Sequence, residues 1–155
     1  MKGKCFIFVL CLMATTALAQ KPSNFSGTWQ FVADRSSNVG MMGQMKITET
    51  IVQTNSSLDV TSHAFYMGKD DESRTHYDLT GKTATNESPM GGPSETVSKW
   101  EAGKLVTTWT GESAVAGGPK VVRKETWSLS PDGKILTVES IRGSSPAIVM
   151  VYEKK

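Results

Sequence analysis

Short stretches in which apolar and polar positions alternate follow one another from residue 28 to residue 153. Each stretch is rich in β-branched and aromatic residues, and turn-forming residues separate neighbouring stretches at intervals of roughly ten residues. No stretch keeps an apolar period of 3.6 residues, so the pattern predicts strands and no long helix. The predicted strands span residues 28–32, 45–53, 58–67, 74–79, 83–86, 96–100, 105–110, 121–129, 135–141 and 147–153.

The connections between these strands are short. The clearest is Ser130-Pro131-Asp132-Gly133, where proline and glycine supply the fixed and the positive φ angles that a turn requires. Residues 68–72 predict the polar tip of another hairpin, and residues 33–44 predict a short connection with at most a single helical turn. Sequential strands joined by short turns favour an up-and-down order. The sequence therefore predicts an all-β fold, an antiparallel up-and-down β-barrel of about ten strands, which is wide enough to leave room inside.

Residues 1–19 have the pattern of a cleaved secretory signal peptide. Lys2 and Lys4 form a basic start, residues 5–17 are almost wholly apolar, and residues 17–19 form a small-x-small cleavage signal. The apolar run is too short to cross about 30 Å of hydrocarbon comfortably, so no membrane span is expected. We expect export, to the periplasm or as a secreted protein, with residues 20–155 forming one domain.

Cleavage changes both the charge and the cysteine content. The whole chain has a formal charge of +2, but losing Lys2 and Lys4 leaves 15 basic residues against 15 acidic ones. A neutral chain gives no support for a nucleic-acid partner or a charged membrane surface. Cys5 and Cys11 leave with the leader, so neither a disulfide nor thiol chemistry is expected in the remaining chain.

Two motifs carry a family resemblance. Phe25-x-Gly27-Thr28-Trp29 resembles the opening motif of the calycins, the lipocalins and fatty-acid-binding proteins, and residues 125–134 are similar to small exported lipocalin-like proteins. The resemblance implies that Gly27 and Trp29 are structural, with Trp29 packing across the barrel floor. The chain end resembles the closing Arg-x-Tyr-Glu-Lys of fatty-acid-binding proteins, whose Arg and Tyr hold a carboxylate. Here Met150 stands at the Arg position and only Tyr152 matches, which argues against a fatty-carboxylate clamp.

The strand at residues 121–129 brings charges onto an aromatic face. Arg123, Glu125 and Trp127 share one face, so an inward Trp127 would bring both charges inside. A buried charge is costly unless it is paired, so the two would pair with each other or orient the polar head of a ligand. Trp109 and Trp127 would line a cavity, unless they only form ordinary core. The candidate ligand-binding residues are Tyr152, Arg123, Met150, Trp109, Trp127 and Glu125.

Two other features each leave alternatives open. Both faces of the last strand, residues 147–153, are apolar, so its outer face needs cover from residues 38–44 or from a second copy, which would make a homodimer. The run Met41-Met42-x-x-Met45 offers thioethers, which bind Cu(I), or a flexible apolar flap over the barrel mouth.

Catalysis has little support in the sequence. The expected domain has no cysteine nucleophile, and its histidines, His63 and His76, stand apart on two strands. No helix is predicted for a glycine-rich phosphate loop to open, and no cofactor is expected. The sequence indicates an exported lipocalin-like protein that binds a small hydrophobic or amphipathic molecule inside the barrel. The alternative is a ligand-free interaction module of the cell envelope that binds a protein through its loops or its apolar last strand.

Overall fold

The computed structural model describes residues 21–87, 92–113, 115 and 117–155, so the predicted leader lies outside the described residues. The elements, in order along the chain, are β1 (Gly27–Phe31), η1 (Ala33–Arg35), η2 (Gly40–Gln44), β2 (Lys46–Gln53), β3 (Ser57–Tyr66), β4 (Lys69–Asp78), β5 (Thr83–Glu87), β6 (Pro93–Glu101), β7 (Lys104–Gly111), β8 (Val121–Leu129), β9 (Ile135–Arg142) and β10 (Ile148–Lys154); η1 and η2 are 3-10 helices. Among the described residues, no helix is long and apolar enough to span a membrane.

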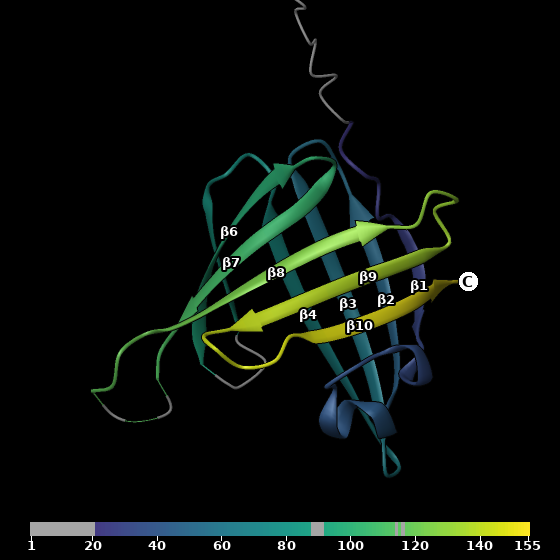
Figure 1. Cartoon of the computed structure of the whole chain (residues 1–155), viewed down its shortest axis with the longest axis horizontal. Coiled ribbons are helices and arrows are strands. Elements are labelled where there is room, and N and C mark those ends of the chain that lie inside the picture. The colour runs from purple at the N-terminus through teal and green to yellow at the C-terminus, as the bar shows by residue number, and fades with distance from the viewer. Residues whose placement is uncertain (1–20, 88–91, 114, 116) are drawn as a thin grey trace, which may run out of the picture.

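The strands form one 10-stranded antiparallel sheet in the order β4-β3-β2-β1-β10-β9-β8-β7-β6-β5. Apart from the pair β4 and β5, strands adjacent in sequence are also adjacent in the sheet, and β1 pairs with β10 to join the two ends of the chain. The sheet therefore curls into a nearly closed barrel whose free edges are β4 and β5 (Figure 1). The predicted antiparallel up-and-down barrel of about ten strands is confirmed.

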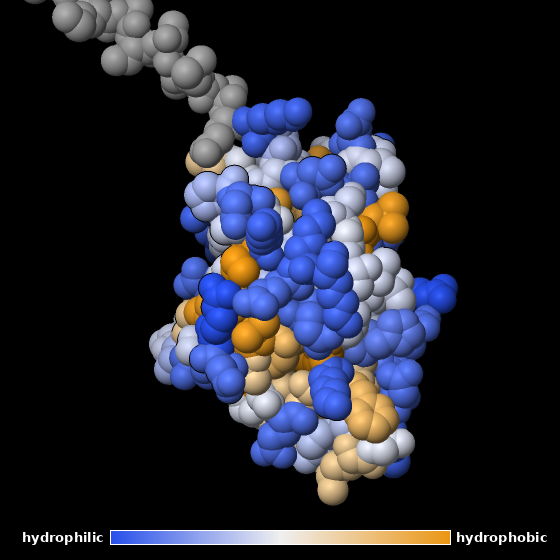
Figure 2. Space-filling model, turned by 90° about the vertical axis from the view of Figure 1, so that its right-hand side faces the viewer, coloured by the Kyte–Doolittle hydropathy of each residue, from blue (hydrophilic) through white to orange (hydrophobic). Residues whose placement is uncertain are grey.

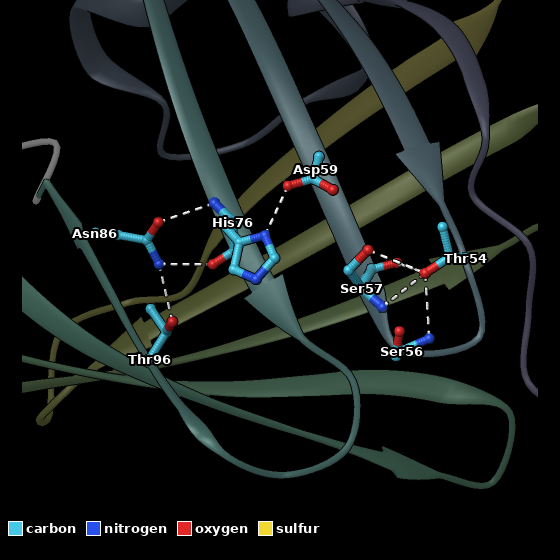
Figure 3. A network of polar contacts seen from close by, with 7 residues as sticks. All are labelled: Thr54, Ser56, Ser57, Asp59, His76, Asn86 and Thr96. Carbon is cyan, nitrogen blue, oxygen red and sulfur yellow. Dashed lines mark hydrogen bonds and ion pairs between the residues drawn. The ribbon is translucent and has the colours of Figure 1, made fainter.

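A side chain bridges the gap between β4 and β5. Asn86 of β5 accepts a hydrogen bond from the backbone N–H of His76 at 2.8 Å and donates one to the carbonyl of His76, also at 2.8 Å (Figure 3). Its amide group thus makes the same pair of bonds that a backbone peptide would make in an antiparallel ladder. The amide also donates to Oγ1 of Thr96 on β6 at 2.9 Å, so Asn86 is held from both sides.

Because the strands alternate in direction, their turns gather at two ends of the barrel. The first end holds the turns β2–β3, β4–β5, β6–β7 and β8–β9, and residues 21–26 lie across it (Figure 1). Ser23 donates through its backbone N–H and its hydroxyl to the carbonyl of Gly103, and Gln53 donates to the carbonyl of Ser23. This strap ties the N-terminal segment to two turns, and we name this end the closed end.

Aromatic side chains fill the closed end. Phe25 and Trp29 are fully buried, and the indole N–H of Trp29 donates to the carbonyl of Phe25 at 2.8 Å. Phe25 stacks on Trp100 with centroids 5.9 Å apart, and it meets Trp127 edge-on at the same distance. Burying such large rings stabilises the fold strongly.

Glycine is required beside this floor. Gly27 has a φ of +140°, which side chains rarely allow, and an added Cβ would lie 2.8 Å from Cε of Lys154. The Lys154 ammonium sits 5.3 Å from the centroid of the Trp29 ring, within cation–π range. Gly27 therefore lets the last strand pass close over the tryptophan that begins the barrel.

The opposite end, named here the open end, carries η1, η2 and the connections β3–β4, β5–β6, β7–β8 and β9–β10. Met42 and Met45 pack against the core there, while Met41 is exposed. On the right-hand face of the molecule, apolar side chains emerge among polar ones, most of them in the lower half, where η1 and η2 lie (Figure 2).

The segment after β1 pairs with the edge of the last strand, β10. Ser37 pairs with Val149 through two backbone hydrogen bonds, and the Ser36 hydroxyl accepts from the N–H of Val151 at 3.0 Å. Asn38 donates to the carbonyl of Ala147. Residues 36–38 thus extend the pairing of β10 beyond the end of β1, within a single chain.

One predicted turn was too long. Residues 68–72 were expected to form a polar tip, but β4 begins at Lys69 and only Met67 and Gly68 make the turn. Both have positive φ angles, +48° and +81°, the combination that a tight two-residue hairpin turn needs. The acidic run after Gly68 pairs with β3, because an exposed strand face tolerates charge.

Candidate functional site

The inner face of β8 carries the predicted charged and aromatic residues together. Trp127 is 4% exposed and Glu125 is 5% exposed, and Arg123 follows them on the same face. Since β8 runs from the open end to the closed end, Trp127 lies nearest the aromatic floor and Arg123 nearest the mouth. The prediction that an inward Trp127 brings both charges inside therefore agrees with the structure.

Arg123, Glu125 and Trp109 form one cluster. The guanidinium nitrogen Nη2 of Arg123 lies 3.2 Å from Oε1 of Glu125, and the Trp109 indole N–H donates to Oε2 of Glu125 at 2.9 Å. The Arg123 guanidinium also stacks 4.6 Å from the centroid of the Trp109 ring. Both oxygens of Glu125 are thus engaged, which is what a buried carboxylate requires.

A second polar contact faces this cluster from β2 and β10. The Tyr152 hydroxyl donates to Oε1 of Glu49 at 3.0 Å, and Sδ of Met150 lies 3.7 Å from the same hydroxyl. Glu49 stands in register with Trp29, so it shares the inner face. We name Glu49, Trp109, Arg123, Glu125 and Tyr152 the polar belt; it lies above the aromatic floor, on the open-end side.

The belt shifts the pKa values of its acids. Burial raises the pKa of Glu49 from 4.5 to about 7; the hydrogen bond from Tyr152 opposes this rise, and the charge of Glu125 adds to it. Burial raises the pKa of Tyr152 well above 10, with Glu49 as the second cause. The pKa of Tyr77 is raised in the same way by burial and then by the charges of Glu125 and Glu49. Both phenols are therefore neutral at ordinary pH.

Three buried polar atoms have no hydrogen-bond partner among the described residues: Oε2 of Glu49, Nε1 of Trp127 and Oγ of Ser94. Buried polar groups are nearly always hydrogen-bonded, so such orphans mark places where another molecule can bind. Glu49 and Trp127 both face inward, one offering an acceptor and the other a donor. Glu49, Arg123 and Met150 face inward and are partly exposed.

All six predicted ligand-binding residues face the interior, but in different roles. Tyr152, Met150, Arg123, Glu125 and Trp109 meet at the polar belt or beside it. Trp127 belongs partly to the floor, where it contacts Phe25 and Tyr77. Arg123 is on β8 and is paired with Glu125, whereas Met150 is on β10.

Sequence reasoning missed Glu49 and Tyr77. The signal for Glu49 was present, because it stands between Ile47 and Ile51 on one face of a strand, and both isoleucines are buried. The sequence signal for Tyr77 is weaker, because its strand carries mostly polar residues. The Tyr77 ring meets the rings of Trp109 and Trp127 edge-on, with centroids 5.8 Å and 5.5 Å away.

The histidines lie away from this site. His76 is bonded to Asp59 at 2.6 Å and His63 lies 3.6 Å from Glu72, in both cases on the outer face of β3 and β4 (Figure 3 shows the first pair). The part of the chain that the structure describes holds no group of three or more His, Cys, Asp or Glu residues placed for a metal ion. Met42 and Met45 pack against the core, and Met41 is exposed.

A depression of about 390 Å³ opens on the outside of the closed end. Gln53 lines it and is bonded to the strap, and Trp100 lines it with the edge of the floor. Its other lining residues are Lys21, Pro22, Asn24, Thr54, Asn55 and Leu79. It offers one tryptophan and no buried charge, whereas the interior offers paired charges and orphan polar atoms.

No family model and no curated protein matches the sequence. Solved structures do match the fold. Echinococcus granulosus fatty-acid-binding protein 1 superposes with a TM-score of 0.65 at 13% identity, covering 84% of this chain and 96% of that one. Human cRBP IV superposes with a TM-score of 0.65 at 15% identity, covering 86% of this chain and 100% of that one. A point mutant of the fluorescent protein UnaG superposes with a TM-score of 0.62 at 17% identity, covering 84% of this chain and 96% of that one. The chain therefore has the calycin-type β-barrel fold that these proteins share.

Proposed function

We propose that this protein is an exported binding protein that holds a small apolar or amphipathic molecule inside its barrel. The observation that carries the proposal is the pair of orphan polar atoms, Oε2 of Glu49 and Nε1 of Trp127, on the inner face of the barrel. A barrel that served only as a packed scaffold would gain stability from apolar side chains at these positions.

The ligand's apolar part would rest against the rings above the floor. Tyr77, Trp109 and Trp127 present edges and faces toward one another, which suits a flat or chain-like molecule. Each Å² of apolar surface buried there contributes about 25 cal/mol before the costs of binding. The polar part would then bind at the polar belt, where Tyr152 and Arg123 fix its orientation.

Entry would take place through the open end. Residues 40–44 and 117–119 border it. The solved structure of the Echinococcus granulosus protein, which by its name binds a fatty acid, supports a ligand-carrying use of this fold. The proposal is one of binding and not of catalysis, since neither histidine shares the interior with the charged cluster.

A second candidate function is favoured by exposed apolar side chains near the mouth. Met67 is 83% exposed, Met41 67% and Phe65 45%, and they come from η2 and the β3–β4 hairpin. Such a surface suits a protein partner or a second copy of the chain. In this alternative the barrel is an interaction module of the cell envelope and carries no ligand.

Native mass spectrometry of the protein purified from the envelope fraction of its own host separates the two. An adduct of lipid-like mass at one per chain would support the carrier function. A bare monomer that also fails to take up apolar probes would overturn it, and a bare dimer would support the interaction module.

The same spectrum tests export. A mass that corresponds to residues 20–155 would show that residues 1–19 are removed. An intact chain recovered from the cytoplasm would contradict the proposed export and would leave the ligand result to be judged by itself.

A further inference from the structure

We propose that the interior site selects amphipathic molecules that carry a protonated amine, and that Glu49 binds this amine through its unpartnered oxygen Oε2. This inference rests on the proposed ligand-carrying function and names the class of its ligand. It stands on the geometry of Glu49, on the balance of charges around it and on the aromatic rings beside it.

The two oxygens of Glu49 are unequal. Oε1 accepts the hydrogen bond from Tyr152 at 3.0 Å, while Oε2 is buried and has no partner in the described parts of the chain. In the ionised form of Glu49, Oε2 accepts hydrogen bonds and donates none, so the partner of this form is a donor. An ammonium group supplies three donors and a positive charge.

The charges of the belt also call for a cation. Arg123 is matched by Glu125 at 3.2 Å, which leaves the negative charge of Glu49 without a counter-charge. Met150 faces the same interior from β10 and is uncharged, so it supplies no cation. A bound ammonium would bring the buried charges to balance, whereas a bound carboxylate would add a third negative group.

Arg142 does not restore the balance. It stands in register with Arg123 on the inner face of β9, but it is exposed at the open end. Charges in contact with solvent are screened by water and salt, so Arg142 acts on the mouth more than on the buried oxygen of Glu49.

The rings next to the belt fit the same class of ligand. The Arg123 guanidinium already stacks 4.6 Å from the Trp109 ring, which shows that these faces accept a cation. Trp127 adds a buried N–H donor without a partner among the described residues, so a ligand with an acceptor such as a hydroxyl gains a second hydrogen bond. The tyrosines that face Glu49, Tyr77 and Tyr152, are neutral and compete with neither charge.

Binding should then depend on pH. Because burial raises the pKa of Glu49 to about 7, the carboxylate form that attracts an amine grows as the pH rises through 7. Alkylamines stay protonated in this range, so amine affinity should rise between pH 6 and pH 8. Tyr152 on β10 and Glu125 on β8 act on this equilibrium, and the charge of Glu49 in turn acts on Tyr77 of β4, next to which Glu125 and Arg123 also act.

Three probes of equal chain length test the inference: dodecylamine, dodecanol and dodecanoate, titrated by calorimetry below their micelle concentrations at pH 6 and pH 8. We expect dodecylamine to bind at least tenfold more tightly than dodecanoate at pH 8. Glu49→Gln should weaken amine binding at least tenfold, remove its rise with pH and change dodecanol affinity less than threefold. Glu139→Gln is the matched control, since Glu139 is exposed on the outer face of β9.

The outcomes separate the two proposals. If dodecanoate binds as tightly as the amine, or if Glu49→Gln keeps the amine preference, the inference is overturned while the carrier function stands. If none of the three probes binds, both are overturned. Circular dichroism of each variant checks folding, and Glu49→Gln should fold well because it removes a buried acid.

Discussion

A single buried carboxyl group ties the stability of this barrel to pH. Burial raises the pKa of Glu49 from 4.5 to about 7 in the folded protein. Between pH 4.5 and pH 7 the folded protein therefore keeps the Glu49 proton, and unfolding releases it. The stabilisation is present in full below pH 4.5 and is lost as pH rises through 7. As the pH rises from 5 to 8, the unfolding free energy of the wild type should fall by about 2–3 kcal/mol relative to that of Glu49→Gln. Urea unfolding at both pH values measures this; parallel pH profiles would contradict it.

The ion pair between Arg123 and Glu125 should behave as one unit. The side chains of Arg123 and Glu125 are 23% and 7% exposed, so removing the cation leaves a buried carboxylate with only the Trp109 bond. We expect Arg123→Met to cost about 3 kcal/mol of unfolding free energy. The double variant Arg123→Met with Glu125→Gln should recover about half of this loss. Thermal and urea unfolding of the single and double variants measure this. If Arg123 and Glu125 acted independently, the losses of unfolding free energy from the two substitutions would simply add.

At the residue scale, the sequence predicted which side chains point into the barrel better than it predicted what they do. Alternation along 121–129 placed Arg123, Glu125 and Trp127 on one inner face, because a strand has a strict period of two. The same argument applied to 45–53 would have found Glu49 between Ile47 and Ile51. What the pattern could not supply is which charges meet across the barrel, since that depends on curvature and register.

Between elements, one side chain replaces a missing ladder. Asn86 bonds to both backbone groups of His76 and to Thr96, so β5 is joined to β4 without strand pairing (Figure 3). We expect Asn86→Ala to cost about 2–3 kcal/mol of unfolding free energy, because it removes both hydrogen bonds to the His76 backbone and the buried one to Thr96. Hydrogen exchange should also speed up at least tenfold at the His76 amide.

A neighbouring substitution isolates this effect. Thr85 precedes Asn86 on β5 and is exposed, so Thr85→Ala should change neither stability nor exchange by a comparable amount. Equal effects of the two substitutions would mean that β5 is weakened generally and that Asn86 does not bridge the strands. Asn86 was not predicted, because its partners are backbone groups of another strand and such pairing leaves no mark in local sequence.

Most element boundaries were predictable, and the exceptions have a local cause. Val121–Leu129 was predicted as the structure has it, because a loop and a Pro-Asp-Gly turn bound it. The predicted strand began too late at the start of β4, because residues 69–72 are charged. Where both faces of a strand are exposed, its charged sequence resembles that of a loop. The two 3-10 helices replace the single helical turn that residues 33–44 indicated.

For the whole molecule, the sequence indicated the architecture and only a class of function. Strand number and short turns lead to an up-and-down barrel, and the neighbouring solved structures share that fold at 13–17% identity. The proposed ligand site, in contrast, is made of residues on β2, β7, β8 and β10 that meet only after the barrel closes. Fold alone therefore leaves function open, and the site has to be tested directly.

The central claim is that the ligand binds inside the barrel at the polar belt. The indole N–H signals of the four tryptophans report on it in a ¹H–¹⁵N spectrum, titrated in turn with dodecylamine and dodecanol. We predict that the Trp109 and Trp127 signals move, while Trp29, whose N–H is bonded to Phe25 at the closed end, stays fixed. Movement of Trp100 alone, which lines the outer depression, or of no indole signal, would contradict the account.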